Sequence, residues 1–128
     1  MPLQPGLRAE THVVVGPDDT AEHVGSGDVP VLGTPRLLAL AEAATVEAVA
    51  SRLEPGQTTV GTRVELDHRV ASPVGARVTI EAELTEVDGR RLVFAVRAAG
   101  ESGAPVADGR IERVVVDRQR FLARVTNG

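Results

Sequence analysis

Only one segment of this chain has the apolar spacing of a helix, and the segments on both sides of it have the spacing of strands. Residues 34–53 place apolar side chains with a period of 3.6, whereas residues 8–16 contain the β-branched run of a strand and the patterned sequence after the helix alternates with a period of two. A lone helix must be buried by the strands that share its core. The sequence therefore predicts an α+β fold in which one long central helix is wrapped by an antiparallel β-sheet.

The turn signals between the patterned segments set the boundaries of the expected elements. Thr34 is a candidate N-cap with Pro35 at the first helical position, and Gly56 is the expected left-handed cap after the helix. A long loop with room for one helical turn is expected at 17–33, and a short helical tail at 118–125. Strands are expected at 8–16, 58–68, 76–89, 90–100 and 106–117.

Composition limits the function classes that this chain can serve. Its 128 residues, 42% of them hydrophobic, fit a single domain over 1–128. The net charge of −4 and the presence of only two aromatic residues argue against a nucleic-acid partner. All cations are arginines, and those at 63, 69, 77, 90 and 91 suit a nucleotide phosphate or a purely solvated surface.

Several features are also expected to be absent. The chain has no cysteine, which excludes disulfides and thiolate metal ligands, and no metal site or cofactor is expected. It has no long apolar run, so no membrane contact is predicted and the expected location is cytoplasmic. One helix covers one face of a sheet and leaves the sheet edges open, so a homodimer formed through an edge is expected.

Two titratable residues lie on faces that should be apolar. Glu42 falls in the middle of the helical arc that includes Leu38 and Val46, and strict alternation places His68 on the same strand face as Val64. Burial of an unpaired carboxylate is costly, so a Glu42–His68 pair is one interpretation. The other is that one or both residues lie at the margin of the core and reach water.

Two further residues have alternative interpretations. The Thr34 hydroxyl either caps the helix or faces a ligand at the helix N-terminus, where free amides favour negative charge. Gly61 interrupts a strand of larger residues, which indicates either a β-bulge or a close approach of a ligand to the backbone.

The spacing of these residues carries a resemblance to a known family. The helix opens with GTP at 33–35, a glutamate follows Thr34 by eight residues, and His68 follows Glu42 by twenty-six. The segment 53–84, with its LEPG turn and GT pair, and the VDGRRL hairpin at 87–92 continue the likeness. The chain resembles the hotdog-fold acyl-CoA thioesterases, and within them the fluoroacetyl-CoA thioesterases.

The resemblance implies a function and a set of site residues. It implies an acyl-CoA substrate, catalytic Thr34, Glu42 and His68, a close backbone contact at Gly61, and an active-site arginine at Arg113. Glu42 would attack the thioester carbonyl or activate the attacking water. The fluoroacetyl-CoA enzyme carries phenylalanines in the segment before the helix, whereas EHVGSGDVP (22–30) has none here, so another small acyl group is an equally good expectation.

Two other functions stay open at this point. A non-catalytic protein that binds an acyl thioester or a small apolar ligand would use the same pocket, and the absence of lid aromatics mildly favours it. A hotdog dehydratase also pairs a carboxylate with a histidine. Its usual histidine-first motif ahead of the helix is not evident in this sequence.

Overall fold

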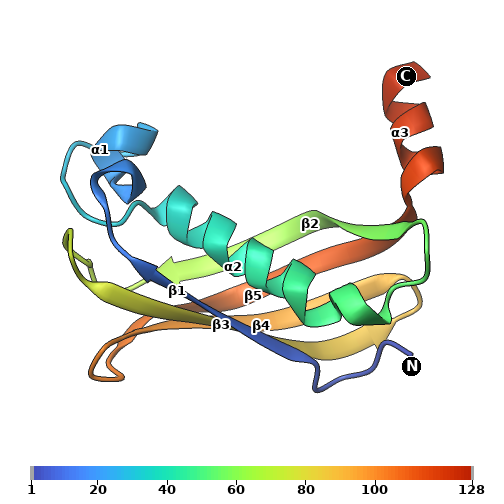
Figure 1. The fold of residues 1–128 in the computed structure, drawn as a ribbon, viewed down its shortest axis with the longest axis horizontal. Helices are drawn as coiled ribbons and strands as arrows, with labels where there is room; N and C mark the ends of the chain where they lie inside the picture. The colour runs from blue at the N-terminus through green and yellow to red at the C-terminus, as the bar shows by residue number, and fades with distance from the viewer. Residues whose placement is uncertain (1, 128) are drawn as a thin grey trace.

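The structure, a computed structural model, describes residues 2–127 and contains one five-stranded antiparallel sheet. The strand order is β1-β3-β4-β5-β2, so that β1 and β2 form the two edges. Figure 1 shows the sheet with a single long helix, α2, crossing one face. The strands are β1 (Arg8–Val14), β2 (Gln57–His68), β3 (Arg77–Asp88), β4 (Arg91–Gly100) and β5 (Pro105–Asp117). The α+β prediction is confirmed.

The central helix begins where the sequence predicts and ends earlier. Helix α2 spans Thr34–Val49, and the chain continues as the 3-10 helix η2 (Ala50–Arg52). Gly56 has a φ of 86°, the left-handed conformation expected of it. It lies in the turn that leads into β2, however, and not directly at the end of α2.

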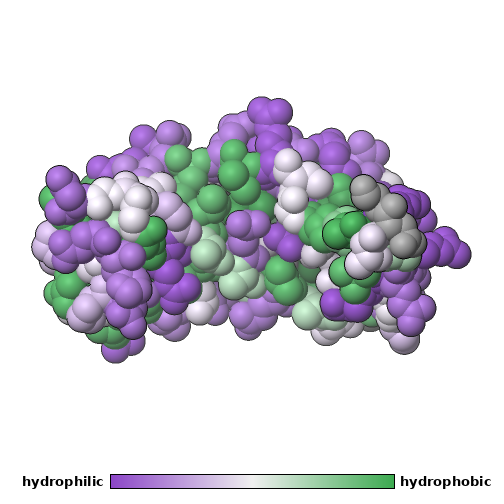
Figure 2. All heavy atoms as spheres, turned by 90° about the horizontal axis from the view of Figure 1, so that it is seen from above, coloured by the Kyte–Doolittle hydropathy of each residue, from purple (hydrophilic) through white to green (hydrophobic). Residues whose placement is uncertain are grey.

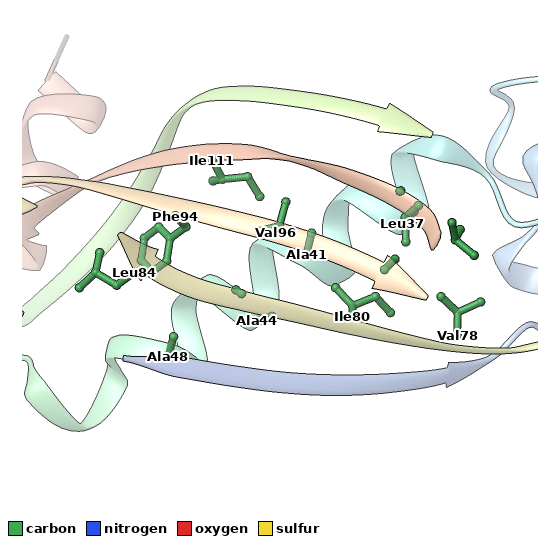
Figure 3. Close-up of a cluster of buried hydrophobic side chains, with 14 of the residues drawn as sticks. Leu37, Ala41, Ala44, Ala48, Val78, Ile80, Leu84, Phe94, Val96 and Ile111 are labelled. Carbon is green, nitrogen blue, oxygen red and sulfur yellow. The ribbon is translucent and has the colours of Figure 1, made fainter. Parts of the chain in front are cut away.

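The core lies between α2 and the sheet, and the helix faces it with small side chains. Figure 3 shows the α2 alanines directed toward Ile80 on β3 and Phe94 on β4. The prediction that Glu42 lies in the middle of the apolar arc is wrong, because that prediction gave the alanines too little weight. Glu42 lies on the flank of the helix, whose buried residues are Leu37, Ala41, Ala44, Thr45, Ala48 and Val49.

A β-bulge changes which residues of β2 face the helix. The register with β5 shifts between Gly61 and Arg63, so Thr62 is an extra residue. Residues directly opposite one another on paired strands share a face. Gly61 is opposite Arg113, and His68 is opposite Ala107, a core residue. Strict alternation along the strand predicts that Gly61 and His68 lie on opposite faces, and this prediction is wrong. Of the two interpretations of Gly61, the β-bulge is confirmed.

The long loop before α2 folds into a small lid. It contains the 3-10 helix η1 (Pro17–Asp19) and the short helix α1 (Ala21–Val24). The lid is tied to the start of α2 by an ion pair between Asp19 Oδ1 and Arg36 Nε at 2.8 Å, and by the Gly33 amide, which donates to the Asp19 carbonyl. The expected loop with a turn of helix is confirmed.

The last element is helix α3 (Arg118–Asn127), which confirms the helical tail. Figure 1 shows it standing at the end of the sheet opposite to the lid. Among residues 2–127, no helix has both the length and the apolar character needed to cross a membrane.

The close packing of α2 predicts a steep penalty for added volume. Ala44 is fully buried, and its neighbour Ala43 is exposed. We expect Ala44→Leu to lower the free energy of unfolding by about 1–3 kcal/mol, because the extra methylenes must force the helix away from the sheet. Ala43→Leu is the matched control and should change it by less than about 0.5 kcal/mol. Urea unfolding of both variants measures this, and equal effects would contradict the packing described here.

Candidate active site

Thr34 and His68 form the first part of the site. Thr34 is the first residue of α2, and Gly33 occupies the N-cap position. The Thr34 hydroxyl lies 2.7 Å from His68 Nδ1 at the end of β2. The N-cap interpretation of Thr34 is therefore wrong. Its hydroxyl joins the start of the helix to the histidine.

The other ring nitrogen of His68 has no protein partner. Nε2 is buried and makes no hydrogen bond with the residues that the structure describes. Burial lowers the pKa of His68, and the nearby Val70 backbone opposes this shift to a smaller extent. The neutral imidazole is thus favoured at neutral pH. A buried ring nitrogen without a partner is positioned to bond to a group from outside the chain.

A cavity of about 270 Å³ adjoins these two residues. The lid forms one wall of it, and the start of α2 and the end of β2 form the other. Only Ser26, Thr34 and His68 contribute polar side chains. Its lining comprises Ala21, Ser26, Gly27, Val29, Val31, Leu32, Thr34, His68 and Ala71.

Glu42, Arg113 and Gly61 form the second part of the site. Arg113 donates a hydrogen bond from its guanidinium to Glu42 Oε2 at 3.3 Å. A Cβ atom at Gly61 would lie only 2.8 Å from the same Oε2. Gly61 thus gives space to the carboxylate of Glu42, and this close approach accounts for the glycine. The Glu42 side chain is 36% exposed.

Sequence reasoning missed the residue that holds Arg113. The Thr59 hydroxyl accepts from Arg113 Nε at 2.9 Å, and the Thr59 carbonyl accepts from the guanidinium at 3.0 Å. Burial lowers the pKa of Arg113, although the charge of Glu42 acts in the opposite direction. The available signal was that Thr59 lies two residues before Gly61 on the same strand face.

The two parts of the site do not meet within one chain. Eight helical residues separate Thr34 from Glu42, which is about 12 Å along the axis. Gly61 and His68 lie on the order of 20 Å apart along β2. Within residues 2–127 the structure shows no contact between the Glu42 carboxylate and the His68 ring. The expected Glu42–His68 pair is not formed inside the protomer.

The described residues also offer no metal centre. Across residues 2–127, no three His, Asp or Glu side chains are placed to hold a metal ion. The chemistry available to the site is that of a carboxylate, an imidazole, a hydroxyl and a guanidinium.

Solved structures with this fold define the class of protein. A structure of the fluoroacetyl-CoA thioesterase has a TM-score of 0.89 and 34% identity, covering 98% of this chain and 96% of that one. A thioesterase superfamily member from Thermus thermophilus has a TM-score of 0.91 and 28% identity, covering 98% and 93%. A hot-dog-like protein from Thermanaerovibrio acidaminovorans has 27% identity and a TM-score of 0.89, covering 98% and 92%. The fold is that of the hotdog thioesterases.

The sequence comparison narrows this class to one family. The profile of the family described as fluoroacetyl-CoA-specific thioesterase matches residues 15–119. The fluoroacetyl-CoA thioesterase of Streptantibioticus cattleyicolor is 35% identical over 96% of this chain and 92% of its own length. This chain belongs to the fluoroacetyl-CoA-specific thioesterase family.

The environment of His68 predicts a pH-dependent stability. Because its pKa is lowered in the folded protein, the unfolded chain takes up the proton first as the pH falls below about 6.5. Wild-type stability should therefore decrease, relative to a His68→Asn variant, from about pH 6.5 downward until the lowered pKa is passed. Urea unfolding between pH 8 and pH 5 measures the difference. His12→Asn, on the exposed side of β1, is the control, and parallel curves for wild type and His68→Asn would contradict the assignment.

Proposed function

We propose that this protein hydrolyses the thioester of a small acyl-CoA, with Glu42 as nucleophile or general base and with Thr34 and His68 as its partners. Solved structures of related thioesterases carry acetyl-CoA, or fluoroacetate together with CoA. The observation that carries the proposal is the placement of Glu42. Arg113 and Gly61 hold one carboxylate oxygen, and Oε1 makes no hydrogen bond among the described residues. Oε1 is thus free to act on a substrate.

A homodimer would bring the two parts of the site together. Strand β2 is a long edge strand, and α2 packs mainly over β1 and β3. The inner face of β2 and the adjoining flank of α2 therefore stay partly uncovered, with Val46 and Val64 both 42% exposed. Figure 2, which looks down on the β2 side of the molecule, shows apolar side chains in the middle of this surface. A second copy of the chain would cover this apolar surface and would also pair with the free backbone groups of the β2 edge.

Symmetry then determines which residues face one another. If two β2 strands pair antiparallel about a twofold axis at Glu65, with the bulged residue Thr62 left unpaired, Gly61 of one protomer lies opposite His68 of the other. Glu42 and Arg113 of one chain would then border the Thr34–His68 cavity of its partner. Each dimer would contain two such composite sites.

The hydrolysis can be written with these groups alone. The thioester carbonyl carbon lies in the cavity, and its developing oxyanion is stabilised by amides of the first turn of α2 and by the Thr34 hydroxyl. Glu42 either takes a proton from the attacking water or attacks the carbon itself, in which case water releases the acyl group. The carbon–sulfur bond breaks, and the leaving thiolate takes up the proton released by the water, which the neutral His68 ring accepts and passes on at Nε2, so that Glu42 and His68 return to their starting forms. The products are the free acid and the CoA thiol.

The cavity supports a small aliphatic acyl group and does not support a strict preference for fluoroacetyl. Its lid wall comes from Ser26, Gly27, Val29 and Val31, without an aromatic ring. Propionyl and short branched acyl groups fit this apolar lining as well as fluoroacetyl does.

Replacement of Glu42 tests the proposal directly. Glu42→Gln keeps the shape of the side chain and its hydrogen bond to Arg113, but removes the base. We expect thiol release from fluoroacetyl-, acetyl-, propionyl- and isobutyryl-CoA to fall by roughly 100- to 10,000-fold, with the fold retained by circular dichroism. Glu47→Gln, at an exposed position on the same helix, is the matched control. Equal turnover by wild type and Glu42→Gln would end this proposal.

Gly61 offers a second test that does not alter any reacting group. The Cβ of Gly61→Ala would collide with Glu42 Oε2, so the flexible carboxylate must move while the backbone stays in place. A displacement of this size should lower kcat/KM on the order of 100-fold. Gly100→Ala is the control, because a Cβ there meets no atom within 4 Å. If both variants retain full activity, the carboxylate position seen here is not the working one.

A further inference from the structure

The arginines of this chain fall into two groups according to their partners. Most of them form ion pairs, including Arg63 with Glu65, Arg69 with Asp108 and Arg91 with Glu112. These three are therefore poor candidates for a nucleotide phosphate, although the sequence proposed them. Among the residues that the structure describes, the arginines without an ion-pair partner are Arg52, Arg77, Arg90, Arg118, Arg120 and Arg124.

Four of these arginines gather at the end of the sheet where α3 stands. Arg118, Arg120 and Arg124 belong to α3, and Arg90 lies in the β3–β4 turn beside it. Two adjoining hollows of about 80 and 180 Å³ share Arg90 and Arg120 in their lining. Arg124 and Phe121 complete the first hollow, and Gln57, the first residue of β2, completes the second.

The one carboxylate in the lining is already engaged. Asp117 Oδ1 accepts a hydrogen bond from the Arg120 backbone amide at 2.9 Å and so caps the start of α3. The Arg118 amide donates to the Gly56 carbonyl at 2.9 Å, which ties α3 to the turn before β2. The guanidinium groups thus outnumber the carboxylate, and the helix that carries most of them is fixed to the sheet.

The hollows also contain the one aromatic side chain outside the core. Phe94 is fully buried under α2, whereas Phe121 is half-buried and faces the first hollow. A phenyl ring offers a stacking surface for a base, and the guanidinium groups next to it can donate hydrogen bonds to phosphate. A nucleotide needs both kinds of contact. An anionic ligand is repelled by the rest of a chain whose net charge is −4.

The distance from the hollows to Glu42 fits the length of an extended substrate. Gln57 and Gly61 lie on the same strand, and the four-residue step between them spans about 13 Å. Glu42 is held against Gly61, so the arginine hollows lie within reach of an extended pantetheine arm whose thioester is at Glu42.

We propose that the Arg90–Arg120–Arg124 hollows bind the phosphorylated nucleotide end of the acyl-CoA substrate, with Phe121 beneath the base. This inference rests on the proposed thioesterase function for the identity of the ligand. It assigns the nucleotide subsite to the same protomer that supplies Glu42 and Arg113.

Steady-state kinetics with two substrates test the assignment. One substrate is the acyl-CoA that the wild type prefers, and the other is the same acyl group on pantetheine, which has no nucleotide. For Arg90→Gln/Arg120→Gln we expect the ratio of KM for acyl-CoA to KM for acyl-pantetheine to rise by about tenfold or more, because charge-assisted hydrogen bonds to phosphate are lost. Arg77→Gln, another arginine without an ion pair, should leave the ratio unchanged.

The outcomes separate this inference from the proposed function. An unchanged KM ratio in the double variant would overturn the nucleotide subsite while leaving the thioesterase intact. The turnover of Glu42→Gln on the two substrates tests the proposed function and does not bear on the nucleotide subsite. If the wild type hydrolyses no thioester, calorimetric binding of adenosine 3′,5′-bisphosphate decides the inference. Binding that weakens about tenfold in the double variant supports it, and binding that is absent or unaffected overturns it.

Discussion

The small side chains between α2 and the sheet determine the geometry of the whole molecule. Ala41, Ala44 and Ala48 are buried between helix and strands, so α2 lies close to the sheet. The close approach allows side chains on the flank of the helix to reach β2. Thr34 contacts His68 at one end of that strand, and Glu42 contacts Gly61 nearer its other end. Larger residues at the alanine positions would separate both pairs at once. The same alanines therefore determine both the packing of the core and the geometry of the site.

The charged and polar groups of the candidate site lie in two separate groups within the protomer. Arg113 is buried and stabilised by Thr59, and it neutralises a carboxylate that keeps one oxygen free. His68 is kept neutral by burial and keeps Nε2 unpaired. A free carboxylate oxygen and an unpaired ring nitrogen, on the order of 20 Å apart along β2, have no common task within one chain. In the proposed dimer, pairing of two β2 edges would bring the two groups together, and it would also cover the apolar surface around Val46 and Val64.

Much of this structure follows from sequence patterns, and the exceptions have local physical causes. Alternation predicted the four strands after α2, and buried residues recur at every second position through most of β3 and in the second half of β5. The position of Glu42 was misjudged because alanine contributes little to an apolar arc, yet it determines which face lies nearest the sheet. The strand face of Gly61 was misjudged because one bulged residue, Thr62, reverses the alternation. Thr59 was missed because its partner Arg113 is 54 residues away, and no local pattern encodes that contact.

The proposed dimer requires Glu42 of one protomer to work with Thr34 and His68 of the other. The most direct measurement mixes two inactive variants, Glu42→Gln and His68→Asn, under conditions that allow subunits to exchange. In a mixed dimer, one composite site receives both substitutions and the other receives none, so the account predicts that thiol release returns, at a level set by one intact site per mixed dimer. If the mixture stays as inactive as either variant alone, although mixed dimers are shown to form, Glu42 and His68 do not act across the interface.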